Sequence, residues 1–281
     1  MTHGMKFTAL ACSLFAAFGL SACGGGGGGT AATSAGTNTP PSSVTGSGDA
    51  SVCFNPALWA TAGTTTHVVS QETYSDGTSP ETITEDSTTL AGQIFNGSPA
   101  TEIDRSRTSV TTGSTGGGTT TSSSKEYYSV DVPNTTLYQL GSQETRPGSF
   151  GTTITTTSTD TPALPLRFNL TAGGSYQTST TETTPSSTTP GVNNVSTISG
   201  PITFVGIESV TIPAGTFQAC HMVFGPTHYQ DSNGSNYSNT LDAWLGVGNG
   251  LVLKSHLVDA SVGNVDSVVT SASINGTPIT P

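Results

Sequence analysis

The feature that most constrains the fold of this chain is the alternation, beyond residue 53, of short strand-forming runs with turn-forming residues. Short runs of Thr, Ser, Val, Tyr and Phe alternate with Gly, Pro, Asn and Asp. Branched and aromatic side chains favour strands, and the intervening residues favour turns. No stretch repeats apolar residues with the spacing of an amphipathic helix, and the connections are too short for parallel crossovers. The sequence therefore predicts a mainly β, antiparallel fold with little helix.

The candidate strands follow these runs, and two Thr-rich segments, 151–161 and 179–190, are expected to be solvated strands or long hairpin tips. One short helical turn is predicted at "NPALWAT", with Asn55 as N-cap and Pro56 at the first helical position. The predicted strands are Thr65–Tyr74, Glu81–Leu90, Thr101–Thr112, Ser123–Val132, Thr135–Leu140, Thr152–Thr159, Ser175–Thr183, Asn194–Ser199, Ile202–Ile212, Thr216–Phe224, Thr240–Leu245, Leu251–Asp259 and Asp266–Ile274.

The amino terminus reads as a signal peptide over residues 1–22. Lys6 is followed by an apolar stretch from Phe7 to Leu20, which is too short to span a bilayer but fits an export signal. The sequence "LSAC" that ends at Cys23 resembles the lipobox of bacterial lipoproteins. That resemblance implies a lipidated Cys23, and Gly24 in place of Asp implies anchoring in the outer membrane. The alternative is an ordinary secretory signal in which Cys23 is incidental.

The rest of the chain divides into a tether and one domain. Residues 23–50 comprise the lipidated cysteine and a tether of Gly, Ser, Thr and Pro, which spans roughly 30 Å as a flexible chain. Residues 51–281 are expected to form a single antiparallel β domain, best defined over 164–275. The net charge of −11 gives the chain no electrostatic reason to bind nucleic acid or anionic lipid headgroups.

The number and positions of the cysteines predict a disulfide bond within this domain. Cys12 leaves with the signal and Cys23 is assigned to the lipid, which leaves Cys53 and Cys220. An exported chain with one remaining pair most simply oxidises it to a disulfide, which contributes up to about 5 kcal/mol in the chain-entropy model. The alternatives are two unrelated buried thiols or a reactive nucleophile at Cys220, beside His221.

Two hairpins carry a family resemblance. Pro213 and Gly215 suit a tight turn, while Gly248 and Gly250 permit the positive φ values of a second one. The pattern V-x-I-P-A-G-T-F, then W, then G-x-G-L-V-x-K, together with "PLRFNLTAGGSY" (165–176), resembles bacterial periplasmic proteins and lipoproteins of uncharacterised function. The resemblance implies a curved antiparallel sheet or half-barrel of meandering hairpins, similar to lipoprotein-carrier proteins. The matching residues are Val210, Ile212, Pro213, Ala214, Gly215, Thr216, Phe217, Trp244, Gly248, Gly250, Leu251, Val252 and Lys254.

Other motifs have ordinary explanations. "GVGNG" (246–250) lacks the helix that a phosphate-binding loop needs, and "DSNGSN" (231–236) departs from a calcium loop. The histidines, His67, His221, His228 and His256, show no metal spacing. Carboxylates among Thr and Ser are expected on solvated strand faces, namely Glu81, Glu85, Asp86, Glu102 and Asp104. A glycosidase pair stays open, because its members need not be close in sequence.

These observations predict a non-enzymatic protein with no cofactor and no metal. Its membrane partner is the bilayer that holds the N-terminal lipid, on the periplasmic or the surface side. We expect a lipid-anchored envelope lipoprotein that binds an apolar small molecule or aids envelope maintenance. The alternative is a structural or adhesive module at the cell surface, motivated by the Thr-rich strands on a flexible tether.

Overall fold

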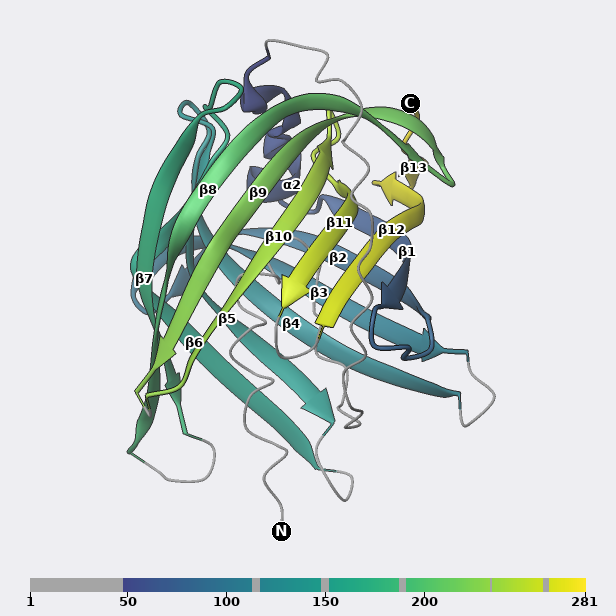
Figure 1. Ribbon diagram of the computed structural model, residues 1–281. Coiled ribbons are helices and arrows are strands. Elements are labelled where there is room, and N and C mark those ends of the chain that lie inside the picture. The colour runs from purple at the N-terminus through teal and green to yellow at the C-terminus, as the bar shows by residue number, and fades with distance from the viewer. Residues whose placement is uncertain (1–47, 113–116, 148–151, 187–190, 233, 260–262) are drawn as a thin grey trace.

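The computed structural model describes residues 48–112, 117–147, 152–186, 191–232, 234–259 and 263–281 (Figure 1). The predicted signal peptide, Cys23 and nearly all of the predicted tether lie outside these residues. Thirteen strands follow one another in a continuous antiparallel meander, and β1 also pairs with β12. Strands β1 to β12 thus close into a barrel, and the short β13 is added at β12.

The strands account for most of the described chain. Their bounds are β1 (Thr65–Tyr74), β2 (Glu81–Phe95), β3 (Ser98–Thr111), β4 (Gly118–Asp131), β5 (Thr136–Pro147), β6 (Thr153–Arg167), β7 (Ser175–Pro185), β8 (Asn193–Ile212), β9 (Gly215–Asp231), β10 (Asn236–Gly246), β11 (Val252–Asp259), β12 (Gly263–Ile274) and β13 (Thr277–Pro278).

Barrel closure corrects the prediction of an open curved sheet or half-barrel. The ladder between β1 and β12 runs from Thr66 opposite Ile274 to Tyr74 opposite Val265. It satisfies the two rows of backbone groups that an open sheet would leave unpaired. The mainly β, antiparallel class with little helix is confirmed.

The predicted strands correspond to observed ones, with one instructive merger. Asn194–Ser199 and Ile202–Ile212 form the single long strand β8, whose register against β9 shifts between Ser199 and Ile202. A bulge there takes up Gly200 and Pro201, the two residues that separate the predicted strands.

Two short helices occupy one mouth of the barrel, at the upper end in Figure 1. They are the 3₁₀ helix η1 (Ala50–Cys53) and the α-helix α2 (Pro56–Ala60). The side chain of Asn55 accepts a hydrogen bond from the backbone N–H of Ala57, and Pro56 occupies the start of α2. The predicted helical turn is therefore confirmed. We refer to residues 50–60 as the plug.

The main apolar core lies between the plug and the barrel wall. Leu58 and Trp59 of the plug pack with residues of many strands, and Trp59 meets the ring of Tyr128 edge-to-face at 5.2 Å. Strand β8 alternates buried and more exposed positions over most of its length, as expected for a strand with one face on a core. Fully or almost fully buried members of this core include Tyr128, Leu137, Phe204, Leu241 and Ala243.

Candidate functional site

The plug is fixed by the disulfide between Cys53 and Cys220 of β9, which is the pairing that the sequence predicts. Both cysteines are almost completely buried, and the described residues include no free cysteine. A link over a sequence separation of 167 residues removes much of the freedom of the unfolded chain. The start of the domain is thus bound to its core.

The predicted glycine turn docks against this plug. Gly248 and Gly250 have φ of 78° and 72°, as the sequence predicts, and the N–H of Gly248 donates to the carbonyl of Val52. A Cβ on Gly250 would lie 3.0 Å from the carbonyl oxygen of Cys53 and from the Cβ of Asn55. Gly250 is therefore needed for both its backbone conformation and its lack of a side chain. "GVGNG" is a turn, as expected.

The hairpin at Pro213–Gly215, part of the sequence motif, has a structural role at the barrel rim. Pro213 and Ala214 form the connection between β8 and β9, and Gly215 has a φ of 136°. Phe217 is 3% exposed and belongs to a second apolar cluster, which also contains Val210, Ile212, Ala219, Leu253, Val269 and Ala272. The hairpin tip thus packs against β11 and β12 and contributes no reactive group.

Trp244 lies at a polar cluster on the sheet face opposite the disulfide. Its indole stacks on the imidazole of His221 with ring centroids 4.4 Å apart, and Lys254 lies 4.8 Å from the indole centroid. The indole N–H donates to Glu208 at 2.5 Å. His221 is paired on both ring nitrogens, 2.9 Å from Glu208 and 2.6 Å from Asp242. Because both sides of the indole are occupied, this Trp is not a free stacking platform.

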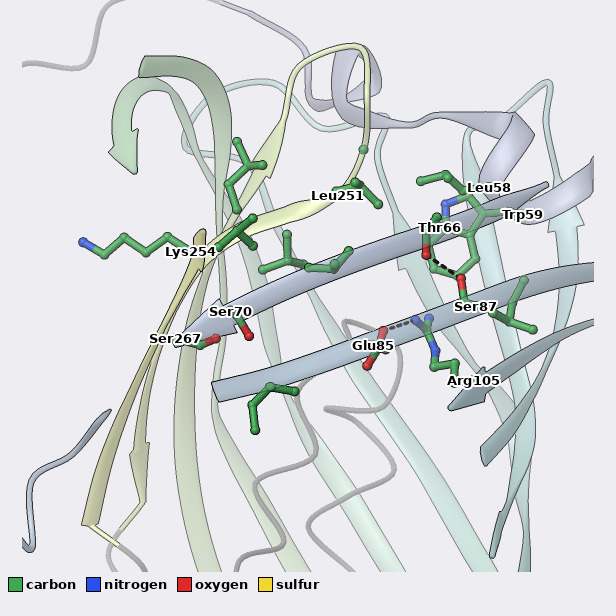
Figure 2. Close-up of a pocket in the computed structure, with 17 residues that line it drawn as sticks. Leu58, Trp59, Thr66, Ser70, Glu85, Ser87, Arg105, Leu251, Lys254 and Ser267 are labelled. Carbon is green, nitrogen blue, oxygen red and sulfur yellow. Dashed lines mark hydrogen bonds and ion pairs between the residues drawn. The ribbon is translucent and has the colours of Figure 1, made fainter. Parts of the chain in front are cut away.

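A cavity of about 80 Å³ lies beneath the plug, between α2 and the strands β1–β3 and β11–β12 (Figure 2). A water molecule takes up roughly 30 Å³ of liquid, so two or three waters would fill it. Pockets for drug-sized ligands begin at about 300 Å³, so an acyl chain does not fit. Its apolar lining is formed chiefly by Leu58, Trp59, Val68, Ile83, Ile103 and Leu251.

A buried ion-pair network borders this cavity. Arg105 of β3 contacts Glu85 of β2 at 2.7 Å and Glu126 of β4 at 3.1 Å, and the Tyr128 hydroxyl donates to Glu126 at 2.9 Å. Complete burial raises the pKa of Glu126 to about 7, although the nearby guanidinium pulls in the opposite direction. The network therefore holds a carboxyl group that titrates near neutrality.

A second buried pair continues the polar interior towards β1. Arg107 of β3 lies 3.1 Å from Glu72, which also accepts the hydroxyl of Tyr74 at 3.0 Å. Burial raises the pKa of Tyr74 far above its usual range. The groups are thus fixed as one ion pair with a neutral phenol, which suits a structural role inside a low-dielectric wall.

The prediction that Glu85 and Glu102 lie on solvated strand faces is wrong. Their residues are 7% and 6% exposed, and Glu102 binds Lys125 at 2.8 Å. By contrast, the side chains of Asp86 and Asp104 are 62% and 44% exposed, as expected. Successive residues of β2 and β3 point to opposite faces, so the sequence places Glu85 and Asp86 on different faces. Because Thr and Ser occupy both faces, the sequence does not show which face is buried.

Two further carboxylates oppose each other across β6 and β7, inside the Thr-rich segments. Asp160 is directly opposite Glu182 in the ladder, and the two residues are 7% and 2% exposed. Burial, followed by the charge of Glu182, raises the pKa of Asp160 to about 8. These segments were predicted to be solvated strands or hairpin tips; over 153–161 and 179–185 they are strands, but this part of each is buried. No motif in the sequence singled out the pair.

The remaining predictions concern the lipidated cysteine, the histidines, metal binding and membrane-spanning helices. Cys23 lies outside the described residues. Among those that the structure describes, no cluster of His, Cys, Asp and Glu is arranged to hold a metal ion. Three of the histidines form pairs with Asp, His67 with Asp86, His221 with Asp242, and His256 with Asp266. No helix in the described ranges is long and apolar enough to cross a bilayer.

Comparisons with known proteins give a distant structural likeness only. No protein-family model and no curated sequence matches the chain. A provisionally classed lipoprotein from Parabacteroides distasonis shares 12% identity (TM-score 0.39, 77% of this chain and 97% of that one). A provisionally classed exported protein with a YmcC-like fold from Bacteroides fragilis shares 11% (0.41, 77% and 98%). A β-barrel-like domain of unknown function from Brucella abortus shares 8% (0.34, 77% and 99%).

Proposed function

We propose that this chain is a lipid-anchored cell-envelope lipoprotein, held at the outer membrane through Cys23, whose barrel is a non-enzymatic structural or binding module. The assignment of the barrel as a structural or binding module is supported by its mouth, which the plug fills and a disulfide holds closed. The plug is joined to β9 by the disulfide, and the cavity beneath it measures about 80 Å³. A mouth closed in this way suits a rigid body that presents its outer surface, and the cavity under the plug is too small for a long acyl chain.

The position of the plug also suggests how the body would be oriented. Asp49 forms a bridge with Thr171, and Gly48 lies against Ile207, so the described chain begins at the plugged mouth. A lipid on Cys23 would precede Gly48 by 25 residues, and Gly/Ser-rich sequence of that length spans roughly 30 Å. In this proposal the plugged mouth is the end that is tethered to the membrane.

Metabolic labelling tests the anchor directly. Cells that express the full chain are labelled with an alkyne-tagged palmitate analogue, with Cys23→Ser as the matched control, and globomycin is used to block cleavage of the lipoprotein signal. We expect label on the wild-type protein only, together with a larger precursor in the presence of globomycin. Equal labelling of both variants, or none, would refute the anchor. Protease treatment of intact cells then separates surface display from a periplasmic position.

Binding of a small apolar molecule is the second candidate, favoured by the aliphatic and aromatic walls of the cavity. A cavity of about 80 Å³ admits a group of a few heavy atoms while the plug stays in place. A larger amphiphile would require the plug to move, and the disulfide opposes this. Native mass spectrometry of the purified chain, with and without reduction, tests the idea: a co-purified amphiphile that leaves upon reduction would support it, and an empty protein in both states would not.

A further inference from the structure

A shallow trough crosses the outer face of β8, β9 and β10, beside the connection between β9 and β10 and away from the plug (Figure 1). Its volume is about 410 Å³, within the range of small-molecule sites. Ile198 and Tyr229 are buried, and successive residues of a strand point to opposite faces, so their neighbours point outward. Two cross-strand rows of such neighbours line the trough, one of Thr197, Gln230 and Asn236 and one of Ser199, His228 and Ser238.

The amide of Gln230 is unused, unlike other glutamine amides of the barrel. Gln71, Gln143 and Gln218 each donate to a hydroxyl directly across a ladder, at 2.6 Å, 3.2 Å and 2.6 Å respectively. Gln230 lies directly opposite Thr197 in the same kind of arrangement, yet neither side chain has a hydrogen-bond partner among the residues that the structure describes. Both side chains are therefore available to a ligand.

His228 differs from the other described histidines in the same way. His67, His221 and His256 each pair with an aspartate, whereas the exposed His228 has no partner within the described part of the chain. Imidazole, amide and hydroxyl groups each offer both a donor and an acceptor. The trough thus gathers donors and acceptors that the fold itself does not use.

The lining of the trough disfavours three classes of ligand. No Asp, Glu, Lys or Arg lines it, so a charged molecule meets no opposite charge. None of the exposed side chains that line it is apolar. Strand β9 is paired on both sides, with β8 and with β10, so a peptide cannot add to it as a further strand. An uncharged molecule rich in hydroxyl and amide groups fits this lining.

We propose that this trough binds an uncharged glycan, whose hydroxyl and N-acetyl groups hydrogen-bond to Gln230, His228 and Thr197. Adjacent strands lie about 4.8 Å apart, so rows that span three strands offer contacts over about 10 Å, enough for about two sugar units. Binding involves no covalent step. The site does not depend on a lipid at Cys23, so it goes beyond the function proposed above and is tested separately from it.

Titration calorimetry on the full mature chain in detergent tests the site with three neutral hexasaccharides. Chitohexaose carries the N-acetyl groups of cell-wall glycans, whereas cellohexaose and maltohexaose are unsubstituted, as in many surface polysaccharides. We expect saturable binding of at least one of them, and at least about tenfold weaker binding of hexagalacturonate and of the chitosan hexamer, because the trough does not compensate their charges. Binding of chitohexaose alone supports a cell-wall glycan, and binding of the unsubstituted sugars supports a surface polysaccharide. No saturable binding of any neutral hexasaccharide, or tighter binding of a charged one, would overturn the proposal.

Two variants and one matched control locate the binding. His228→Ala and Gln230→Ala should each weaken association with the neutral hexasaccharide about fivefold, as expected for loss of one hydrogen bond, and the double variant should weaken it further. Gln71→Ala removes an amide that already bonds to Thr82 and should bind as the wild type does. The Tm of each variant checks that it is folded. Wild-type affinity in the double variant, or an equal loss in Gln71→Ala, would show that the glycan does not bind in this trough.

Discussion

The two halves of the barrel are stabilised by different kinds of interior contact. The half from β8 to β12 provides much of the apolar core, such as Phe204, Phe224 and Leu241, and holds the plug through Cys220. The half from β1 to β7 is rich in Thr and Ser, and it buries ion pairs and opposed carboxylates. One wall is therefore stabilised mainly by burial of apolar area and a covalent link. The other depends on electrostatic matching inside the barrel.

This difference teaches that composition alone does not reveal where a β-barrel is polar. Burial of a charge is costly unless a partner compensates for it. Arg105, between Glu85 and Glu126, is compensated by these carboxylates, whereas burial and the charge of Glu182 raise the pKa of Asp160 to about 8. The polar half should accordingly respond to charge and pH, and the apolar half to the disulfide and packing.

The largest effect is expected at Arg105. Its replacement by Ala leaves two buried carboxylates facing each other without a cation, and loss of one partner from a buried ion pair costs about 3–5 kcal/mol. Urea unfolding at pH 7 measures the free energy of unfolding. His67→Ala is the matched control, since the side chains of His67 and its partner Asp86 are 49% and 62% exposed and exposed pairs contribute about 0–1 kcal/mol. Equal losses for the two variants would show that the polar half does not depend on its interior charges.

Removal of the disulfide between Cys53 and Cys220 should lower the free energy of unfolding by nearly as much. Cys220→Ser is expected to lower the free energy of unfolding by about 2–5 kcal/mol, mainly because the unfolded chain regains freedom. The Cys53→Ser variant should lose the same amount, and the double variant no more than either single one. A double variant whose loss is the sum of the two would mean that the cysteines act as separate packed groups rather than as one link.

The pH dependence of stability distinguishes the halves further. Asp160 has a folded-state pKa of about 8, raised from its ordinary value of 3.8, so between these values the native chain binds a proton that the unfolded chain has released. Its contribution to stability is present at low pH and is lost as pH rises towards 8. Asp160→Asn should remove this slope and stabilise the protein at pH 8.5, as measured by the difference in Tm from the wild type. A difference that is constant from pH 5 to pH 8.5 would contradict it.

The smallest predicted effect concerns the turn below the plug. Gly250→Ala introduces both a strained φ and a close contact with the plug, whereas Gly248→Ala introduces the strained φ with open space around the new methyl group. A residue forced into the left-handed region costs roughly 1–2 kcal/mol. Gly250→Ala should therefore lose more stability than Gly248→Ala in the same urea titration. Identical losses would show that the turn does not press against the plug.

Much of the fold follows from local sequence signals. Alternation and turn residues predicted the strands, with β1 matched at both ends, and Asn55 and Pro56 predicted the start of α2. The pairing of Cys53 with Cys220 followed from export and elimination. These predictions succeed because strand propensity, capping and turn chemistry act over a few residues.

The interior site was not predictable in the same way. Glu85, Arg105 and Glu126 come from three different strands, and their meeting depends on the register of two ladders. A shift by one residue would place all of them on the outer face. Because Thr tolerates both faces of a strand, the Thr-rich runs gave no apolar pattern from which to tell inside from outside.

By itself, the sequence determined a meander of antiparallel strands and two cysteines available for one link, because composition and local propensity encode these features directly; the export leader stays a prediction. Only the tertiary structure decided that β1 pairs with β12, that the first helices fill the mouth and that carboxylates meet inside the wall. Closure and register are set by contacts between residues as many as 210 positions apart, such as Thr65 and Asn275. These long-range contacts contribute to stability only once the barrel has formed.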